Sequence, residues 1–178
     1  MAVVINGNGT VTGISVGGLP DGIVDTDMLA ANAVTAAKAN PGLGKVIQTV
    51  HAETNTRTSC TSGSYIDTTL TANITPSSAS NKVFIMVTSD YYVNSGTGGA
   101  VSIFRGSTNL GHSTNGFGVV DGGPKGGILS IIVEDAPSST SQQTYTLKSI
   151  RVNGSNSFDI PRDPSKEPAL MSLFEVAP

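Results

Sequence analysis

The chain has 178 residues, a formal net charge of -3 and only 13% charged residues, which is about half the usual share. The ten basic residues are scattered, so there is no positively charged patch of the kind that binds nucleic acid. No apolar run approaches the length that spans a bilayer. The single cysteine, Cys60, excludes an internal disulfide. This length predicts one ordinary domain with a small appendage, and neither nucleic acid nor membrane insertion is expected.

The first residues predict a small hairpin followed by a linker. An apolar run at residues 3–5 is separated by Asn-Gly-Asn-Gly from a second run at residues 10–12. Asn-Gly favours a tight hairpin turn because both residues accept positive φ. A two-stranded hairpin is only marginally stable by itself, so we expect it to add to another sheet or another chain. The glycine-rich residues 17–22 are interpreted as the linker.

A degenerate ten-residue repeat follows the linker. Residues 33–40 repeat the pattern of residues 23–32 in degenerate form. Asp25 or Thr26 is a suitable N-cap for a short alanine-rich helix. Because such a helix is marginal alone, residues 1–42 are interpreted as a segment that orders around copies of itself or on a larger body. A capping helix on the chain's own β domain is the alternative. The residues expected to anchor or oligomerise this segment are Val3, Ile5, Val11, Ile14, Met28, Leu29 and Val34.

Residues 43–178 have the pattern of an all-β domain. Seven or eight short strands with turns between them predict an antiparallel β-sandwich with a jelly-roll-like arrangement. The run at residues 82–88 is apolar on both faces, which predicts a strand in the centre of its sheet. Its one face carries Val83, Ile85 and Val87, and its other face carries Phe84 and Met86. The strand-like runs lie at residues 45–50, 65–70, 82–88, 100–105, 128–133, 144–150, 157–160 and 170–176.

No residue pattern indicates a cofactor, a metal site or a catalytic centre. His51 and His112 have no carboxylate or cysteine at ligand spacing, so structural or surface histidines are expected. Cys60 is interpreted as a polar-loop or strand-edge residue with nothing beside it to activate the thiol. Residues 118–125 superficially resemble a phosphate loop, but a proline separates the last glycine from the lysine, and we interpret them as a flexible loop. We therefore do not expect an enzyme.

Two polar regions are candidates for ligand binding. Sugars offer C–H faces and hydroxyls, so a binding patch for them should combine aromatic faces with planar polar side chains. Residues 90–94 are the best local candidate, and the long polar loop around residues 112–117 is the second. The alternative is that the tyrosines pack at a subunit interface, where this residue type is favoured. The candidate residues are Tyr91, Tyr92, Asn94, His112, Asn115 and Phe117.

Three segments resemble elements of bacteriophage tail-fibre proteins. Residues 32–38 are similar to the "NAVTxAK" repeats of such fibres. Residues 70–83 look like a recurrent element of their C-terminal β domains, in which an "ITPSSxSNKI" turn connects two strands. Residues 173–176 are similar to the "LMEV"-type finish of the same domains. The resemblance covers roughly residues 6–40, 70–88 and 143–178.

The resemblance implies a homotrimeric structural protein of the virion, made in the host cytoplasm without a signal peptide. Its N-terminal segment would attach to other virion proteins, and its C-terminal β domain would be displayed for host attachment. The binding candidates named above would then contact a receptor, either a glycan or a protein of the host surface. Three copies around one axis would multiply weak contacts by avidity.

Two other functions remain open at this point. A typical fibre has many shaft repeats, whereas this chain has about two, so a capsid decoration or head-fibre protein is the first alternative. A glycan-cleaving tailspike is the second. Such an enzyme needs two carboxylates that face each other across the sugar. It also usually needs a long groove, and this domain is small.

Overall fold

The structure is a computed structural model that describes residues 4–5, 11–12, 45–163, 165 and 168–178. The chain divides into two units, Met1–Leu43 and Gly44–Pro178. In the first unit, β1 (Val4–Ile5) pairs antiparallel with β2 (Val11–Thr12), which confirms the predicted hairpin. Ile5 and Val11 are direct partners in it. The predicted linker, the alanine-rich helix and the anchoring candidates Val3, Ile14, Met28, Leu29 and Val34 lie outside the described residues.

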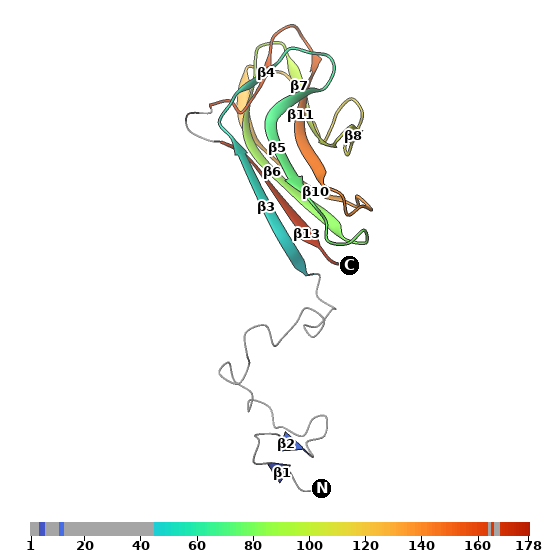
Figure 1. Ribbon diagram of the computed structural model, residues 1–178. Coiled ribbons are helices and arrows are strands. Elements are labelled where there is room, and N and C mark those ends of the chain that lie inside the picture. Colours follow the sequence, from blue (N-terminus) through green and yellow to red (C-terminus); the bar gives the residue numbers. More distant parts are fainter. Residues whose placement is uncertain (1–3, 6–10, 13–44, 164, 166–167) are drawn as a thin grey trace. The chain divides into compact units, whose positions relative to one another are not determined.

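The second unit consists of two antiparallel sheets that pack face to face (Figure 1). This arrangement confirms the predicted all-β sandwich, and no helix occurs in the described residues of the unit. The first sheet contains β3 (Val46–Thr54), β4 (Thr58–Cys60), β6 (Lys82–Val93), β10 (Lys125–Asp135), β12 (Phe158–Ile160) and β13 (Ala169–Val176). The second contains β5 (Ile66–Ile74), β7 (Gly98–Arg105), β8 (Thr108–Asn109), β9 (Val119–Val120) and β11 (Gln143–Asn153).

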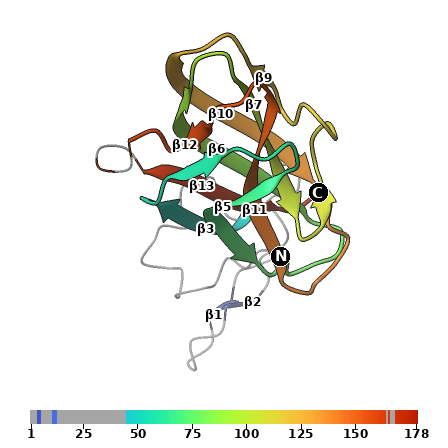
Figure 2. The ribbon, with the colours of Figure 1, turned by 90° about the horizontal axis from the view of Figure 1, so that it is seen from above.

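The strand order is that of a jelly roll. Successive long strands alternate between the sheets, so that the first sheet runs β3-β13-β6-β10 and the second runs β5-β11-β7 (Figure 2). The short strands β8 and β9 both pair with β7, and β12 and β4 extend the first sheet beyond the end of β13. The predicted jelly-roll-like topology is therefore confirmed. One expectation was wrong: residues 118–125 are not a plain loop, because they contain β9 and the start of β10.

Alternating apolar side chains of both sheets form the core. Since successive residues of a strand point to opposite faces, every second residue of β5 and β6 is buried. Burial of each large aliphatic side chain contributes about 1.5–3 kcal/mol. β6 pairs with β10 along one edge and with β13 and β12 along the other, which confirms its predicted central place. The largest fully buried side chains include Tyr145, Phe158, Leu70, Ile74, Ile85 and Leu173.

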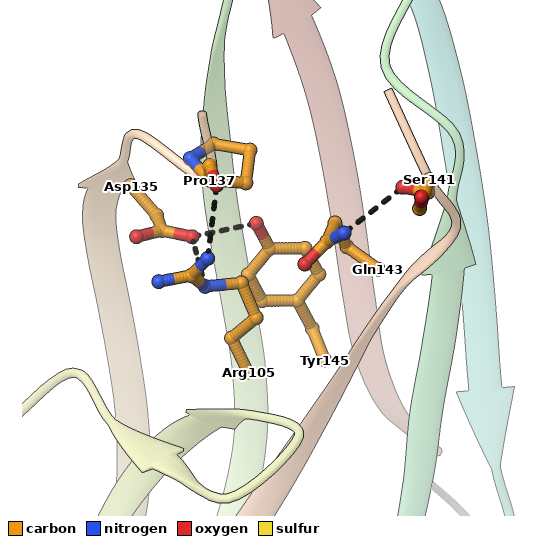
Figure 3. A network of polar contacts seen from close by, with 6 residues as sticks. All are labelled: Arg105, Asp135, Pro137, Ser141, Gln143 and Tyr145. Atoms are coloured by element: carbon orange, nitrogen blue, oxygen red, sulfur yellow. Dashed lines mark hydrogen bonds and ion pairs between the residues drawn. The ribbon is translucent and has the colours of Figure 1, made fainter. Parts of the chain in front are cut away.

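A buried polar cluster joins the two sheets at one end (Figure 3). The carboxylate of Asp135, at the end of β10, accepts a hydrogen bond of 2.7 Å from the Tyr145 hydroxyl of β11. The same oxygen lies 3.0 Å from Nε of Arg105, whose Nη1 donates to the carbonyl of Pro137. Burial, followed by the neighbouring carboxylate, raises the pKa of Tyr145 above its ordinary value. The cluster fixes the connection between β10 and β11 without leaving the buried carboxylate unpaired.

A second buried carboxylate ties the chain's end to the β5–β6 turn. Glu175 of β13 is fully buried, and its Oε1 accepts hydrogen bonds of 2.7 Å from the amide and the hydroxyl of Ser77. Asn81 donates to the same oxygen, and Gln48 donates to Oε2, both at 2.5 Å. Burial opposes ionisation, but these donors outweigh it and lower the pKa of Glu175 to about 2. Two of the segments that resemble phage fibres, residues 70–83 and 173–176, thus meet at this side chain.

Candidate functional site

The six predicted binding residues do not form one site. Tyr91 and Tyr92 are neighbours on β6, so their side chains leave the sheet on opposite faces. The Tyr91 ring packs 6.0 Å from the ring of Phe158, and Tyr91 lines a cleft together with Phe117. Tyr92 lines a different hollow on the outer face of the first sheet. Asn94 donates hydrogen bonds to the carbonyl and the hydroxyl of Ser157, so its amide holds a loop in place.

His112 and Asn115 lie in a tight turn. Nδ1 of the exposed His112 accepts hydrogen bonds from the amides of Thr114 and Asn115, at 3.2 and 3.1 Å. A pair of backbone hydrogen bonds between His112 and Gly116 closes the turn. The imidazole of His112 is therefore engaged with its own turn.

The outer face of the first sheet carries a strip of exposed apolar side chains. Phe84 of β6 lies directly opposite Phe174 of β13, and Met86 lies directly opposite Ile132 of β10. The exposed fractions are 36% for Phe84, 44% for Met86 and 66% for Ile132, while Phe174 is half-buried. Ile128, two pleat repeats from Ile132 on the same face of β10, is 71% exposed. We call these five residues the apolar strip. Contiguous apolar surface of this kind marks interaction sites in soluble proteins.

The apolar strip reaches a free sheet edge. Among the described strands, β10 pairs only with β6, so its other edge offers backbone N–H and C=O groups along its length of 11 residues. Long apolar edge strands are usually covered, because they pair readily with another chain. Near the end of this strand, the carboxylate of Glu134 lies 2.5 Å from Nζ of Lys82 on β6. The rest of the outer face of β10 is apolar or small, which suits a protein contact.

A cleft of about 270 Å³ opens between the sheets beside this edge. It is lined by Tyr91, Phe117, Val119, Ile128 and Phe158, among others. Phe117 and Val119 are 37% and 43% exposed, so the cleft continues the apolar strip around the edge of the sandwich. Gly99 forms its floor, where an added Cβ would lie 2.1 Å from the Phe158 ring. An apolar side chain from another molecule fits this cleft better than a polar ligand does.

A polar hollow of about 250 Å³ lies at the other end of the same outer face. It is lined by Arg57, Tyr92, Asp159 and Arg162. Asp159 of β12 pairs with Tyr92 on one side and with Ser59 of β4 on the other, so its carboxylate leaves the sheet beside the Tyr92 ring. The guanidinium carbon of Arg162 lies 5.2 Å from the centre of that ring. The hollow thus joins two cations, one anion and one aromatic ring.

The charged groups of the hollow are held by their neighbours. The carboxylate of Asp90 accepts hydrogen bonds from the amides of Arg162 and Asp163, at 2.8 and 3.1 Å. Arg57 donates to the carbonyl of Arg162. Asp159 is only 8% exposed, and its Oδ1 has no hydrogen-bond partner among the residues that the structure describes. A buried acceptor without a donor is costly, which makes this oxygen the most distinctive atom of the hollow.

Of the four residues that line the hollow, the sequence predicts only Tyr92 as a binding residue; Arg57, Asp159 and Arg162 are not predicted. They are far apart in the chain, and only the pairing of β4, β12 and β6 brings them together. One signal was available, because Asp159 is a charged residue between the apolar Phe158 and Ile160 of a short strand. Cys60 proved to be fully buried in β4, where its thiol faces the carbonyl of Ser149 at 3.5 Å.

No protein-family model matches the chain, and no curated protein is detectably similar to it in sequence. In the part of the chain that the structure describes, no three His, Cys, Asp or Glu side chains gather as metal ligands. No helix among the same residues is long and apolar enough to cross a membrane.

Proposed function

We propose that this chain is a structural subunit of a bacteriophage particle, a short homotrimeric tail fibre. The N-terminal unit attaches to other virion proteins, and the β-sandwich is displayed for attachment to the host surface. The observation that carries the proposal is the apolar strip, because a sheet face with Ile128 and Ile132 more than half exposed calls for a protein partner. A second copy of the same chain is the simplest such partner.

Closed three-fold symmetry suits the position of the apolar strip. The strip lies on the outer face of the first sheet and the cleft opens between the sheets, with Ile128 bordering both, so one copy can present the strip to the cleft side of the next. A head-to-tail contact of this kind forms a ring when the rotation closes. Each fully buried isoleucine would contribute about 1.5–3 kcal/mol before the entropy of association is subtracted.

The turn held by Glu175 supports the phage assignment. The carboxylate accepts hydrogen bonds from Ser77, Asn81 and Gln48, so the Ser and Asn of the "ITPSSxSNKI" turn and the Glu of the "LMEV"-type finish have one shared structural task. This contact gives a physical reason for both segments to occur in one domain. It supports the resemblance independently of the alanine-rich repeat.

Imaging of the intact particle at residue resolution tests this proposal. We expect three copies around an axis associated with the tail, with residues 1–43 against the particle and the β-sandwich pointing outward. Many copies spread over the capsid shell would contradict it and would identify a decoration protein instead.

A further inference from the structure

We propose that the hollow formed by Arg57, Tyr92, Asp159 and Arg162 binds one acidic sugar unit of a glycan, through its carboxylate and its hydroxyls. This inference rests on the proposed function, in which the β-sandwich meets a host surface, and it names the ligand class and the residues. The hollow lies on the outer face of the first sheet, at the end away from Phe84 and Phe174 of the apolar strip. The hollow borders the other end of the strip, because Ile128 lies opposite Asp90 and Arg162 lies over Gly126 of β10.

Asp159 sets the first requirement on the ligand. Asp159 is 8% exposed, and its Oδ1 is covered by protein and has no donor among the described residues. A turn of the Asp159 side chain toward the hollow would let a ligand O–H or N–H group donate to its carboxylate and relieve the cost of leaving a buried acceptor unpaired. Sugar hydroxyls are donors of this kind, whereas chloride, sulfate or a simple carboxylate has no proton to give at neutral pH.

The two arginines set the second requirement. A guanidinium presents several N–H donors in one plane and matches a carboxylate with two parallel hydrogen bonds. The guanidiniums of Arg57 and Arg162 are exposed, whereas Asp159 is buried and the carboxylate of Asp90 is held by the amides of Arg162 and Asp163. A ligand unit with one carboxylate matches an exposed guanidinium. A polyphosphate chain is a poorer partner, because it would also bring repeated negative charge close to Asp90 and Asp159.

The hollow is already arranged in the absence of a ligand. The backbone of Arg162 is fixed by Asp90 at its amide and by Arg57 at its carbonyl, while Tyr92 supports the guanidinium. Side chains that are held before binding lose less entropy on binding. At about 250 Å³ the hollow is smaller than the roughly 300–1,000 Å³ of sites for drug-sized ligands, which suits a single sugar unit. Three weak sites on one trimer would gain affinity through avidity.

A titration of the full chain with defined sugars tests the proposal. The probes are short oligosaccharides of galacturonate, glucuronate and N-acetylneuraminate, each paired with the same sugar after reduction of its carboxylate to an alcohol. We expect saturable binding of at least one acidic probe, by calorimetry or by NMR shifts of the arginine side chains, and at least tenfold weaker binding of its reduced form. Failure of all acidic probes, or equal binding of a reduced form, would overturn the proposal.

Variants assign the binding to this hollow. Asp159→Ala removes both acceptor oxygens, and we expect at least tenfold weaker binding of the sugar. Arg57→Ala changes an exposed side chain, so it keeps the test decisive if Asp159→Ala does not fold. Arg151→Ala, on β11 of the other sheet, is the matched control and should bind as the wild type does. Unchanged binding by a folded Arg57→Ala or Asp159→Ala would overturn the assignment.

Sugar binding by the hollow and trimer formation can be tested separately on the same samples. Sedimentation of each protein reports its oligomeric state independently of sugar binding. A trimer that binds none of the acidic sugars would overturn the inference alone. A monomer that binds one of them would support the hollow and contradict the trimeric fibre.

Discussion

The outer faces of the two sheets differ in their side chains: those of the second sheet pair with one another, whereas those of the first sheet are apolar and exposed. On the second sheet, Lys148 pairs with Asp67 at 2.7 Å and lies 4.6 Å from the centre of the Phe104 ring. The hydroxyls of Thr71 and Thr146 are 3.1 Å apart, so neighbouring strands of this face satisfy one another. On the first sheet the corresponding positions are the exposed Phe84, Met86, Ile128 and Ile132. The outer face of the second sheet therefore suits contact with water, and we propose that the outer face of the first sheet contacts another protein.

The difference also shows why strand patterns alone could not predict the role of each face. A strand that is apolar on both faces predicts a covered position, and β6 has this pattern. Within one chain β6 is central in its sheet, yet Phe84 and Met86 remain 36% and 44% exposed. A second subunit could bury these side chains. From one sequence, burial by a second subunit and burial by the same chain give the same apolar pattern.

The largest expected effect comes from charging the apolar strip. The double variant Ile128→Asp, Ile132→Asp would place two carboxylates where the proposed interface needs apolar contact. We expect the dissociation constant of the trimer to rise at least about 100-fold, since each buried isoleucine contributes about 1.5–3 kcal/mol. Analytical ultracentrifugation measures it. The matched control is Thr71→Asp on the outer face of the second sheet, which should leave the trimer intact.

A smaller effect, on stability rather than assembly, is expected at the buried carboxylate. Glu175→Gln replaces one acceptor oxygen by a donor that faces other donors, so we expect the free energy of unfolding to fall by about 2–3 kcal/mol. Urea unfolding followed by circular dichroism at pH 7 measures this loss. Lys82→Ala, which removes an exposed partner of Glu134, should cost well below 1 kcal/mol and serves as the control.

The same carboxylate predicts how stability depends on pH. The pKa of Glu175 is lowered from 4.5 to about 2 by its hydrogen bonds, against the opposing effect of burial. Its ionised form therefore stabilises the fold fully above pH 4.5, and this stabilisation is lost as the pH falls toward 2. The wild type should lose stability over this range more steeply than Glu175→Gln. Parallel pH profiles of the two proteins would contradict the role assigned to the carboxylate.

The smallest effect is expected on the polar face of the second sheet. Asp67→Asn removes the ion pair with Lys148, but the Asp67 side chain is 68% exposed. Exposed ion pairs contribute about 0–1 kcal/mol, so the midpoint of urea unfolding should shift only slightly and the oligomeric state should not change. A loss of assembly in this variant would reverse the assignment of the two faces.

Much of the fold could be predicted because alternating apolar residues report burial directly. The eight predicted runs all coincide with strands, and the Asn-Gly hairpin near the N-terminus has the expected partners. The short strands β4, β8 and β9 are not predicted, because two or three residues carry too little pattern to be recognised. The hydrogen bonds to Glu175 are not predicted either, since their donors come from β3 and from the β5–β6 turn, both far from residue 175 in the chain.

The candidate site was less predictable than the fold. Tyr92 is predicted to bind a ligand because it is an aromatic residue beside polar ones, and it lines the hollow. Its neighbours there depend on the pairing of β12 with both β4 and β6, which local sequence does not encode. Tyr91 was chosen for the same reason as Tyr92, but the pleat directs it to the cleft between the sheets. A shift of one residue along a strand decides which of two neighbours faces solvent.

The central claim is that the outer face of the first sheet is an interface between copies of this chain. Sedimentation equilibrium of the full chain at micromolar concentration tests it most directly. For the proposed trimer we expect a single species of three times the monomer mass of 18.1 kDa. A stable species of 18.1 kDa that persists at these concentrations would contradict it.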